Sequence, residues 1–186
     1  MLVFLDFEAS SLGKQSYPIE VGWVFEDGRA EDHLIRPASG WEDWDPEAEA
    51  IHKIPRALLL GEGEHHEAVA QRMLDVLAGH DLLASAPSWD GKWMSVLLRA
   101  AGFPRHSLRL RDTDEAHREA AVSILTPVLA PEKLGPAVEE LLVRTAARDR
   151  GAVSHRALAD AEAERLRWLA VRDAATALAA AVHAQG

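Results

Sequence analysis

The first apolar segment of the chain ends in two acidic residues that flank an aromatic one. Residues 2–7 read Leu-Val-Phe-Leu-Asp-Phe and Glu8 follows, so Phe7 lies between Asp6 and Glu8. Side chains two residues apart on a β-strand point to the same face, which would put both carboxylates on one side and Phe7 in the core. Neighbouring carboxylates on a buried strand repel each other unless a cation or a proton compensates them. The pair predicts a cation site, although two solvated acids at a strand tip show the same pattern.

A histidine and an aspartate stand five residues apart near the end of the chain. Gly151 precedes them and an Ala-, Leu- and Glu-rich run follows, which predicts that Ser154 or His155 lies at a helix start. Asp160 then lies about one and a half turns into the helix, where it can face a cleft that His155 approaches. A neutral imidazole, with an ordinary pKa of about 6.5, suits general-base catalysis. A capped surface helix with an exposed histidine is the alternative interpretation.

A third candidate acid, Asp90, follows the apolar segment 82–86 and a short turn. It stands where a predicted helix begins. Sheets in α/β proteins place ligand-binding groups where a strand passes into a helix. An aspartate at this position is also favoured by helix capping and by the helix dipole, so the position alone leaves both interpretations open.

The segments around these acids predict an α/β protein whose C-terminal part is helical. Apolar runs rich in β-formers alternate with turn residues, and helical periodicity starts at Glu64. Strands are expected at 2–7, 19–25, 33–36, 81–85 and 108–110. Helices are expected from Pro46, at 64–78, at 89–101 and over most of 114–183, with breaks near Pro127, Pro131, Gly135 and Gly151. This order predicts a central mixed five-stranded sheet flanked by helices.

Composition is that of an ordinary globular protein. The 186 residues are 48% hydrophobic and 27% charged, which predicts a single domain over residues 1–186. The absence of cysteine excludes disulfide scaffolds, thiolate zinc sites and cysteine nucleophiles. No apolar run approaches the roughly 20 residues that span a bilayer, and the first residues show neither the basic region nor the small-residue cleavage site of a signal peptide. We therefore expect a soluble, cytoplasmic protein without a membrane partner.

The charge is strongly negative and unevenly distributed. Twenty basic and 30 acidic residues give a net charge of −10; residues 1–66 carry 14 acidic and 5 basic residues, whereas residues 67–111 carry 4 and 6. The chain thus lacks the overall basic face with which nonspecific nucleic-acid-binding proteins neutralise phosphates. An enzyme that holds phosphates through bound cations does not need that face. Seven arginines fit either a strand path beside the cleft or a solvated face: Arg105, Arg109, Arg111, Arg144, Arg148, Arg150 and Arg156.

The order of these motifs resembles that of the DEDDh 3′–5′ exonucleases, the superfamily of proofreading exonucleases and ribonuclease T. An acidic pair on a first strand is followed by an aspartate after a later strand and by a His-x-x-x-x-Asp motif at a late helix. Similar segments are 5–12, 18–23, 33–37, 51–54 and 155–161, the last of which, His-Arg-Ala-Leu-Ala-Asp-Ala, is the most specific. The resemblance covers nearly the whole chain, to around residue 170, and implies a ribonuclease H-like fold.

The resemblance also implies a catalytic site. Asp6, Glu8, Asp90 and Asp160 match the four metal-binding carboxylates, and His155 matches the general base. Two divalent cations would offset the four negative charges, and hard oxygen ligands favour Mg²⁺ or Mn²⁺ over zinc. Such a pair of cations can activate a water and stabilise the leaving 3′-oxygen. The implied reaction releases nucleoside 5′-monophosphates from the 3′ end of single-stranded DNA or RNA.

Four further residues are implied in holding the terminal nucleotide. Phe7 and Ala9 would do so through their backbone, Leu12 as a wedge, and Trp89 beside the second motif. Many family members carry threonine at the position of Ala9, asparagine at that of Ala86 and phenylalanine at that of Trp89. Trp89 keeps an aromatic ring, whereas Ala86 lacks the polar contact of an asparagine.

The alternative function is a ribonuclease H-like module that binds nucleic acid or regulates without turnover. All five catalytic positions are filled, which favours the enzyme, because such a module has no need of them. The expected partner is a single-stranded nucleic acid or oligonucleotide, and the protein is expected to be a monomer or homodimer. Glu20 is interpreted as a buried or rim acid without a direct metal role. Trp41 and Trp44 are interpreted as an aromatic plug, with base stacking as the alternative.

Overall fold

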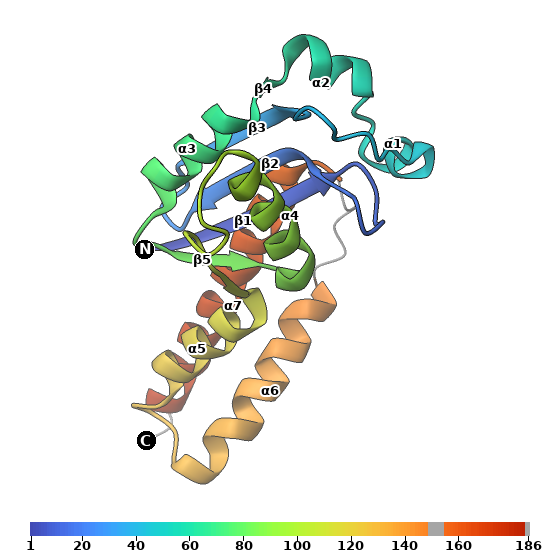
Figure 1. Ribbon diagram of the computed structural model, residues 1–186. Coiled ribbons are helices and arrows are strands. Elements are labelled where there is room, and N and C mark those ends of the chain that lie inside the picture. Colours follow the sequence, from blue (N-terminus) through green and yellow to red (C-terminus); the bar gives the residue numbers. More distant parts are fainter. Residues whose placement is uncertain (149–154, 185–186) are drawn as a thin grey trace.

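Six strands form one mixed sheet in the computed structural model, which describes residues 1–148 and 155–184. The apolar segments β1 (Leu2–Ala9) and β2 (Pro18–Phe25) pair antiparallel, and β2 pairs antiparallel with β3 (Ala30–Arg36). On the other side of β1, β5 (Asp81–Ala84) and then β6 (Leu110–Asp112) are added in parallel. The two-residue β4 (Glu64–His65) pairs with β3, so the order is β4-β3-β2-β1-β5-β6 (Figure 1).

Helices cover both faces of this sheet. The first face packs against α3 (His66–Leu77) and α4 (Pro87–Ala100), whose Met73 and Leu97 share a core with Leu5 and Phe7. The second face packs against α5 (Thr113–Leu125) and α7 (Ala157–His183), and Phe4 lies against Trp168 with ring centroids 5.9 Å apart. The short helices α1 (Pro46–His52) and α2 (Arg56–Glu62) lie between β3 and β4.

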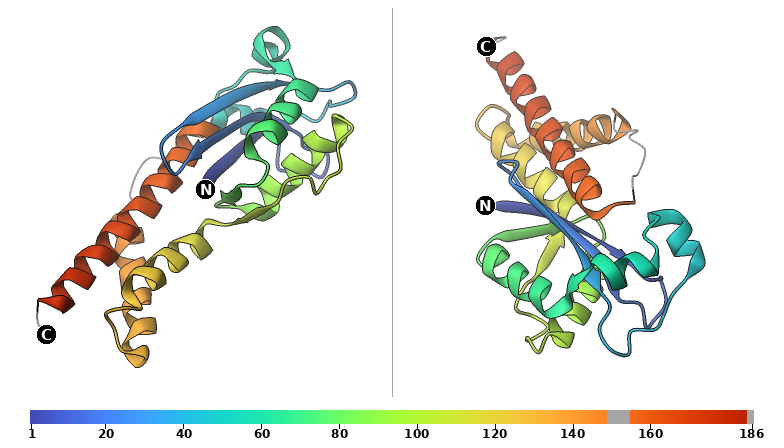
Figure 2. Two further views of the ribbon diagram at one scale, coloured as in Figure 1. Left: turned by 90° about the vertical axis from the view of Figure 1, so that its left-hand side faces the viewer. Right: turned by 90° about the horizontal axis from the view of Figure 1, so that it is seen from above.

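Three helices continue beyond the sheet as an extension. The C-terminal part of α7 packs with α5 and α6 (Pro131–Arg148) around a separate apolar cluster that includes Leu125, Val138 and Val171. Figure 2 shows this extension projecting away from the sheet, with α7 running through both parts. At 27 residues, α7 is about 40 Å long, so one helix joins the extension to the sheet. Within the described residues, no helix combines the length and the apolar character that crossing a membrane requires.

The predicted α/β class is confirmed, and several element bounds differ from the prediction. The sheet has six strands rather than five, because the polar pair Glu64–His65 joins the edge of β3 before α3 begins. The last strand is Leu110–Asp112 rather than 108–110, since Leu108 is buried in the core. The sequence analysis did not predict α2, and Gly135 does not interrupt α6.

The start of the last helix also differs from the expectation. It begins at Ala157, so His155 precedes the helix by two residues instead of opening it. Gly151 and Ser154, which were expected to mark this start, lie outside the described residues, as does Arg150.

Candidate active site

Asp6 and Glu8 lie on the same face of β1, as the spacing predicted, and Phe7 lies in the core on the opposite face. Their face is the one on which Phe4 packs against α7, so both carboxylates are enclosed where the strand leaves the apolar layer. The pairing of β1 with β2 shifts register between Glu8 and Ala9. Such irregularities end regular pairing and re-aim side chains, and they are common beside active sites.

Burial and mutual repulsion raise the pKa values of these two carboxyl groups and favour their uncharged forms. The pKa of Asp6 is raised to about 9, first by burial and then by the charges of Asp90, Glu8 and Asp160. The pKa of Glu8 is raised to about 7, again first by burial and then by Asp160. A positive charge beside these carboxyl groups would favour their ionised forms and lower both pKa values.

Asp90 reaches the same site from the first turn of α4. It is 2% exposed, and burial raises its pKa to about 7, although the backbone amides of Phe7 and Ala86 partly oppose this shift. Its Oδ2 is buried and has no hydrogen-bond partner within the described part of the chain. A buried carboxylate oxygen without a partner is costly, and a cation would satisfy it.

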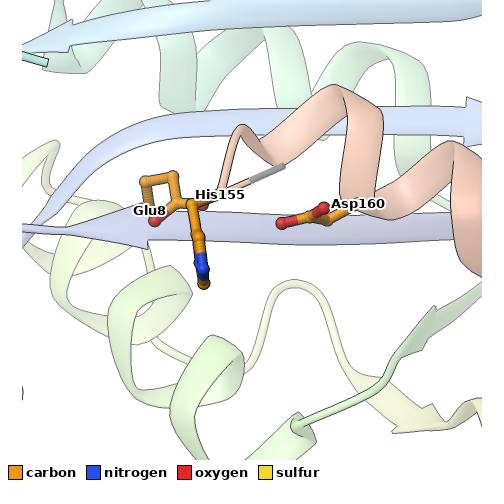
Figure 3. Close-up of side chains that lie close together, drawn as sticks. All are labelled: Glu8, His155 and Asp160. Atoms are coloured by element: carbon orange, nitrogen blue, oxygen red, sulfur yellow. The ribbon is translucent and has the colours of Figure 1, made fainter. Parts of the chain in front are cut away.

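His155 and Asp160 approach Glu8 from the start of α7 (Figure 3). One ligand atom from each of these three side chains lies within 4.8 Å of the others. Asp160 is in the first turn of α7, and its amide donates to the carbonyl of Arg156 over 3.0 Å. His155 is exposed and has a φ of 50°, in the left-handed region that non-glycine residues seldom adopt. Glu8, Asp160 and His155, which precedes α7, thus lie together, and Asp6 and Asp90 are near enough to interact with the acids of this group through their charges.

Glu20 fixes the start of α7 on the sheet. This acid on β2 is 1% exposed and pairs across the strands with Glu8. Its carboxylate accepts hydrogen bonds from the Arg156 Nε over 3.0 and 3.1 Å and from the backbone amide of Ala157 over 3.0 Å. Glu20 was expected to be a buried or rim acid without a direct metal role, and its part in orienting the residue after His155 was not predicted. The available signal was a single acid in an otherwise apolar strand, which needs a partner.

Gly22 allows α7 to lie directly on β2. A Cβ on this residue would lie 2.3 Å from the backbone nitrogen of Leu158 and 2.6 Å from the carbonyl carbon of Ala157. Gly22 is the β2 residue opposite Asp6. The glycine thus sets how closely the helix that carries Asp160 approaches the strand that carries Asp6.

We expect Gly22→Ala to reduce both the cleavage rate and the stability of the protein. The added methyl group must push the first turn of α7 outward, which costs about 1–3 kcal/mol as overpacking. A displacement of about 1 Å at a catalytic group costs about 100-fold in rate. Nuclease assays and thermal unfolding of the two proteins measure both effects. The matched control is Gly61→Ala on α2, where a Cβ meets nothing within 4 Å. Wild-type activity in Gly22→Ala would show that this close approach is not required.

A further carboxylate, which was not predicted from the sequence, lies in this neighbourhood. Glu164 lies one helical turn beyond Asp160, and its charge contributes to the raised pKa of Asp6. It also forms an ion pair with Arg167 at 2.8 Å. Because the 3.6-residue period puts positions 160 and 164 on one helix face, the spacing was the signal that could have found it.

The residues proposed to hold the terminal nucleotide differ in exposure. Phe7 and Ala9 are buried, whereas Leu12 is 71% and Trp89 39% exposed. Trp89 stacks on Trp93 with ring centroids 5.6 Å apart. The loop that carries Leu12 is tied to α4, because Lys92 Nζ donates to the carbonyl of Gly13 over 2.6 Å. The exposed side chains of Leu12 and Trp89 thus lie on two connected segments, each of which is close in sequence to an acid of the site, Glu8 or Asp90.

Trp41 and Trp44 have local partners. The ring of Trp41 stacks on Tyr17 at 5.0 Å, and Trp44 Nε1 donates to Glu49 over 2.7 Å. Both contacts fit the interpretation of Trp41 and Trp44 as a local aromatic plug.

The site fits hard divalent cations. Asp6, Glu8, Asp90 and Asp160 offer only oxygen ligands, which Mg²⁺ and Mn²⁺ prefer. Three of these groups have pKa values raised by burial. Cations bound here would lower those pKa values and satisfy Asp90 Oδ2.

We expect the stability of the cation-free protein to fall as the pH rises. In the unfolded chain these acids ionise near 3.8 to 4.5, whereas in the folded protein Asp6 ionises near 9 and Glu8 and Asp90 near 7. The folded state therefore binds more protons than the unfolded chain between these values. Its stability falls progressively as the pH rises above about 4, and the loss ends near pH 7 for Glu8 and Asp90 and near pH 9 for Asp6. Thermal unfolding in EDTA from pH 5 to 9 measures the slope. Mn²⁺ should restore the melting temperature at pH 8, and a melting temperature that rises with pH in EDTA would contradict this account.

Comparisons with known proteins agree with the fold. No family model matches the sequence, and no curated protein matches it. E. coli exonuclease I in complex with a dT13 oligonucleotide is similar with a TM-score of 0.63 and 18% identity, over 90% of this chain and 40% of that chain. A moderately thermophilic exonuclease I from Methylocaldum szegediense is similar with a TM-score of 0.64 and 19% sequence identity, over 90% of this chain and 40% of that chain. The chain spans about two fifths of the length of these proteins and shares their ribonuclease H-like fold.

Proposed function

We propose that the protein is a DEDDh-type 3′–5′ exonuclease that hydrolyses single-stranded DNA or RNA with the help of two divalent cations. The observation that carries this proposal is the meeting of Asp6, Glu8, Asp90, Asp160 and His155 in one acidic site. The fold is that of exonuclease I, whose described structures include complexes with single-stranded oligonucleotides. We further propose that residues 1–186 form a single exonuclease domain.

Each residue of the site has a distinct role in this proposal. The four carboxylates hold Mg²⁺ or Mn²⁺, and these cations would supply charge stabilisation for the attacking water and the leaving 3′-oxygen. His155 accepts the proton of the attacking water as general base. Glu20 and Arg156 are positioning residues, because their ion pair holds the backbone next to His155. The raised pKa values keep the carboxyl groups partly protonated until cations bind.

The terminal nucleotide would bind between the two exposed apolar side chains. The backbone of Phe7 and Ala9 lies beside Asp6 and Glu8 and would hold the sugar and phosphate. Leu12 and Trp89 are exposed enough to contact the base from two sides. Stacking of a base on an aromatic ring contributes about 1–3 kcal/mol and tolerates any base. This arrangement favours an activity without strong sequence preference.

Product identification tests the proposed reaction. Single-stranded DNA and RNA of equal sequence are incubated with the protein and Mn²⁺, and the released mononucleotides are separated by chromatography. We expect nucleoside 5′-monophosphates, because the 3′-oxygen is the leaving group. Nucleoside 3′-monophosphates would contradict the mechanism. No cleavage of either polymer, by protein shown to bind Mn²⁺, would contradict turnover and favour the ribonuclease H-like binding module.

A further inference from the structure

A groove of about 620 Å³ runs between α4 and the segment that joins α4 to β6. On the α4 side it is lined by Gly91, Lys92 and Ser95, and on the other side by Arg105, His106 and Arg109. Four of these six residues carry, or can carry, a positive charge. Among the residues that the structure describes, no carboxylate lines the groove.

The charge of this region is opposite to that of the chain as a whole. Residues 91–111 contain five basic residues and no acidic residue, in a chain with 30 acidic and 20 basic residues. The acids that border the region are Asp90, which points into the active site, and Asp112, which caps α5. The groove is therefore a local cationic surface on an acidic protein, and such a surface attracts polyanions.

The two arginines of the groove differ from the ion-paired arginines of the protein. Eight arginines in the described ranges have a carboxylate within 4.0 Å: Arg29, Arg72, Arg111, Arg118, Arg144, Arg156, Arg165 and Arg167. Arg105 and Arg109 form no such ion pair with a described residue, and Arg105 Nε contacts the ring of His106 at 2.9 Å. Two guanidinium groups without an internal counter-ion are available to an external anion.

The groove and the proposed active site share α4. Gly91, in its wall, directly follows Asp90, and Pro87, also in its wall, opens the same helix. Lys92 Nζ lies 5.1 Å from the ring centroid of Trp89, so the exposed aromatic ring adjoins the cationic wall. A basic track combined with an exposed aromatic ring is the arrangement that binds single-stranded nucleic acids.

We propose that this groove binds the phosphodiester backbone of the substrate strand on the 5′ side of the nucleotide being removed. The inference rests on the proposed function and adds a second contact region to it. Arg105 and Arg109 bind phosphates and raise the affinity for strands long enough to leave the active site. A dinucleotide has only one phosphodiester, which lies at the active site during cleavage, so it offers no further backbone phosphate to Arg105 and Arg109. The groove therefore makes the enzyme select polymers over the shortest oligonucleotides.

Binding and kinetics of a double variant test this inference. Arg105→Ala combined with Arg109→Ala removes two charges far from the metal ligands in sequence. The control is Arg29→Ala combined with Arg172→Ala, which changes the net charge equally at exposed positions between β2 and β3 and on α7. Fluorescence anisotropy with a labelled strand of about twelve nucleotides in EDTA measures binding without cleavage. Cleavage of the same strand and of a dinucleotide, with Mn²⁺, measures KM and kcat.

We expect the groove variant to bind the longer strand at least tenfold more weakly, while the control binds as the wild type does. The slope of log affinity against log salt should fall by about 1.4, because each lost single-strand phosphate contact contributes about 0.7. KM for the longer strand should rise with kcat unchanged, and dinucleotide cleavage should be unaffected. Unchanged binding and salt slope, or an equal loss on the dinucleotide, would overturn the inference. If the wild type cleaves nothing, the exonuclease proposal fails, and the anisotropy result still decides for or against the groove.

Discussion

Replacement of Asp6 by asparagine is expected to abolish cleavage and to make the cation-free protein more stable. The asparagine keeps the size of the side chain but cannot hold a cation as a carboxylate does. The stabilisation that bound cations give the transition state is several kcal/mol, so the rate should fall about 1,000-fold or more. The pKa of Asp6 is about 9 in the folded protein, so at pH 8 folding requires this carboxyl group to take up a proton that it does not hold in the unfolded chain. This proton uptake lowers the stability of the wild type, and the neutral amide of asparagine avoids it. The melting temperature in EDTA should rise by about 2–4 °C for each kcal/mol relieved.

The two effects have opposite signs, which separates a metal ligand from a structural acid. The control is Asp173→Asn, at an exposed position on α7, which should change neither quantity. Nuclease assays with Mn²⁺ and thermal unfolding in EDTA are carried out on the same preparations. A sharp fall of the melting temperature in Asp6→Asn would show that the carboxylate stabilises the fold. Retained cleavage would remove Asp6 from the proposed site.

Replacement of His155 by asparagine is expected to lower the cleavage rate by about 100- to 10,000-fold without weakening Mn²⁺ binding. A positioned general base contributes a factor of this size. Asparagine is chosen because His155 has a φ of 50°, and asparagine adopts the left-handed conformation more readily than most residues. Calorimetry with Mn²⁺ and single-turnover cleavage measure the two quantities separately. If Mn²⁺ affinity falls together with the rate, His155 is a metal ligand, and wild-type turnover would exclude it from the mechanism.

Local patterns in the sequence predicted the parts of the site that depend on one element. The spacing of Asp6 and Glu8 predicted their shared face, because the two-residue period of a strand needs no knowledge of the rest of the fold. The position of Asp90 at the opening of a helix was also predicted, because the end of an apolar segment and the start of helical periodicity are local signals too. The order of strands and helices was sufficient for the α/β class, and the short helix from Pro46 was also predicted correctly.

Features that depend on contacts between distant segments were not predicted. Glu20 accepts a hydrogen bond from the amide of Ala157, 137 residues away, and this contact fixes where α7 begins. The two residues of β4 form a strand only because the edge of β3 is available to them. The helix α2 lacks a capping side chain and is held by the packing of Leu59 against the core. The basic composition of residues 91–111 is visible in the sequence, but the groove needs α4 and residues 105–109 to lie side by side.

The geometry of the site depends on a few supporting contacts as much as on its acids. Asp6 and Glu8 come from a strand and Asp90 from a helix start. Asp160 comes from α7, and His155 from the residues just before it; the place of this helix is set by Glu20 and Gly22. These supports are made by buried or closely packed groups of the sheet. Rigid supports of this kind hold catalytic groups within the small tolerances that hydrolysis requires.

The direction and the metal dependence of cleavage test the central claim most directly. A single-stranded DNA labelled at its 5′ end is incubated with the wild-type protein and with Asp6→Asn, in Mn²⁺, in Mg²⁺ and in EDTA, and the labelled products are resolved by length. We predict a ladder that shortens one nucleotide at a time from the 3′ end with the metals, and no ladder in EDTA or with the variant. A ladder that persists in EDTA or in Asp6→Asn, or immediate release of the labelled 5′ nucleotide, would contradict the proposed two-metal 3′–5′ exonuclease.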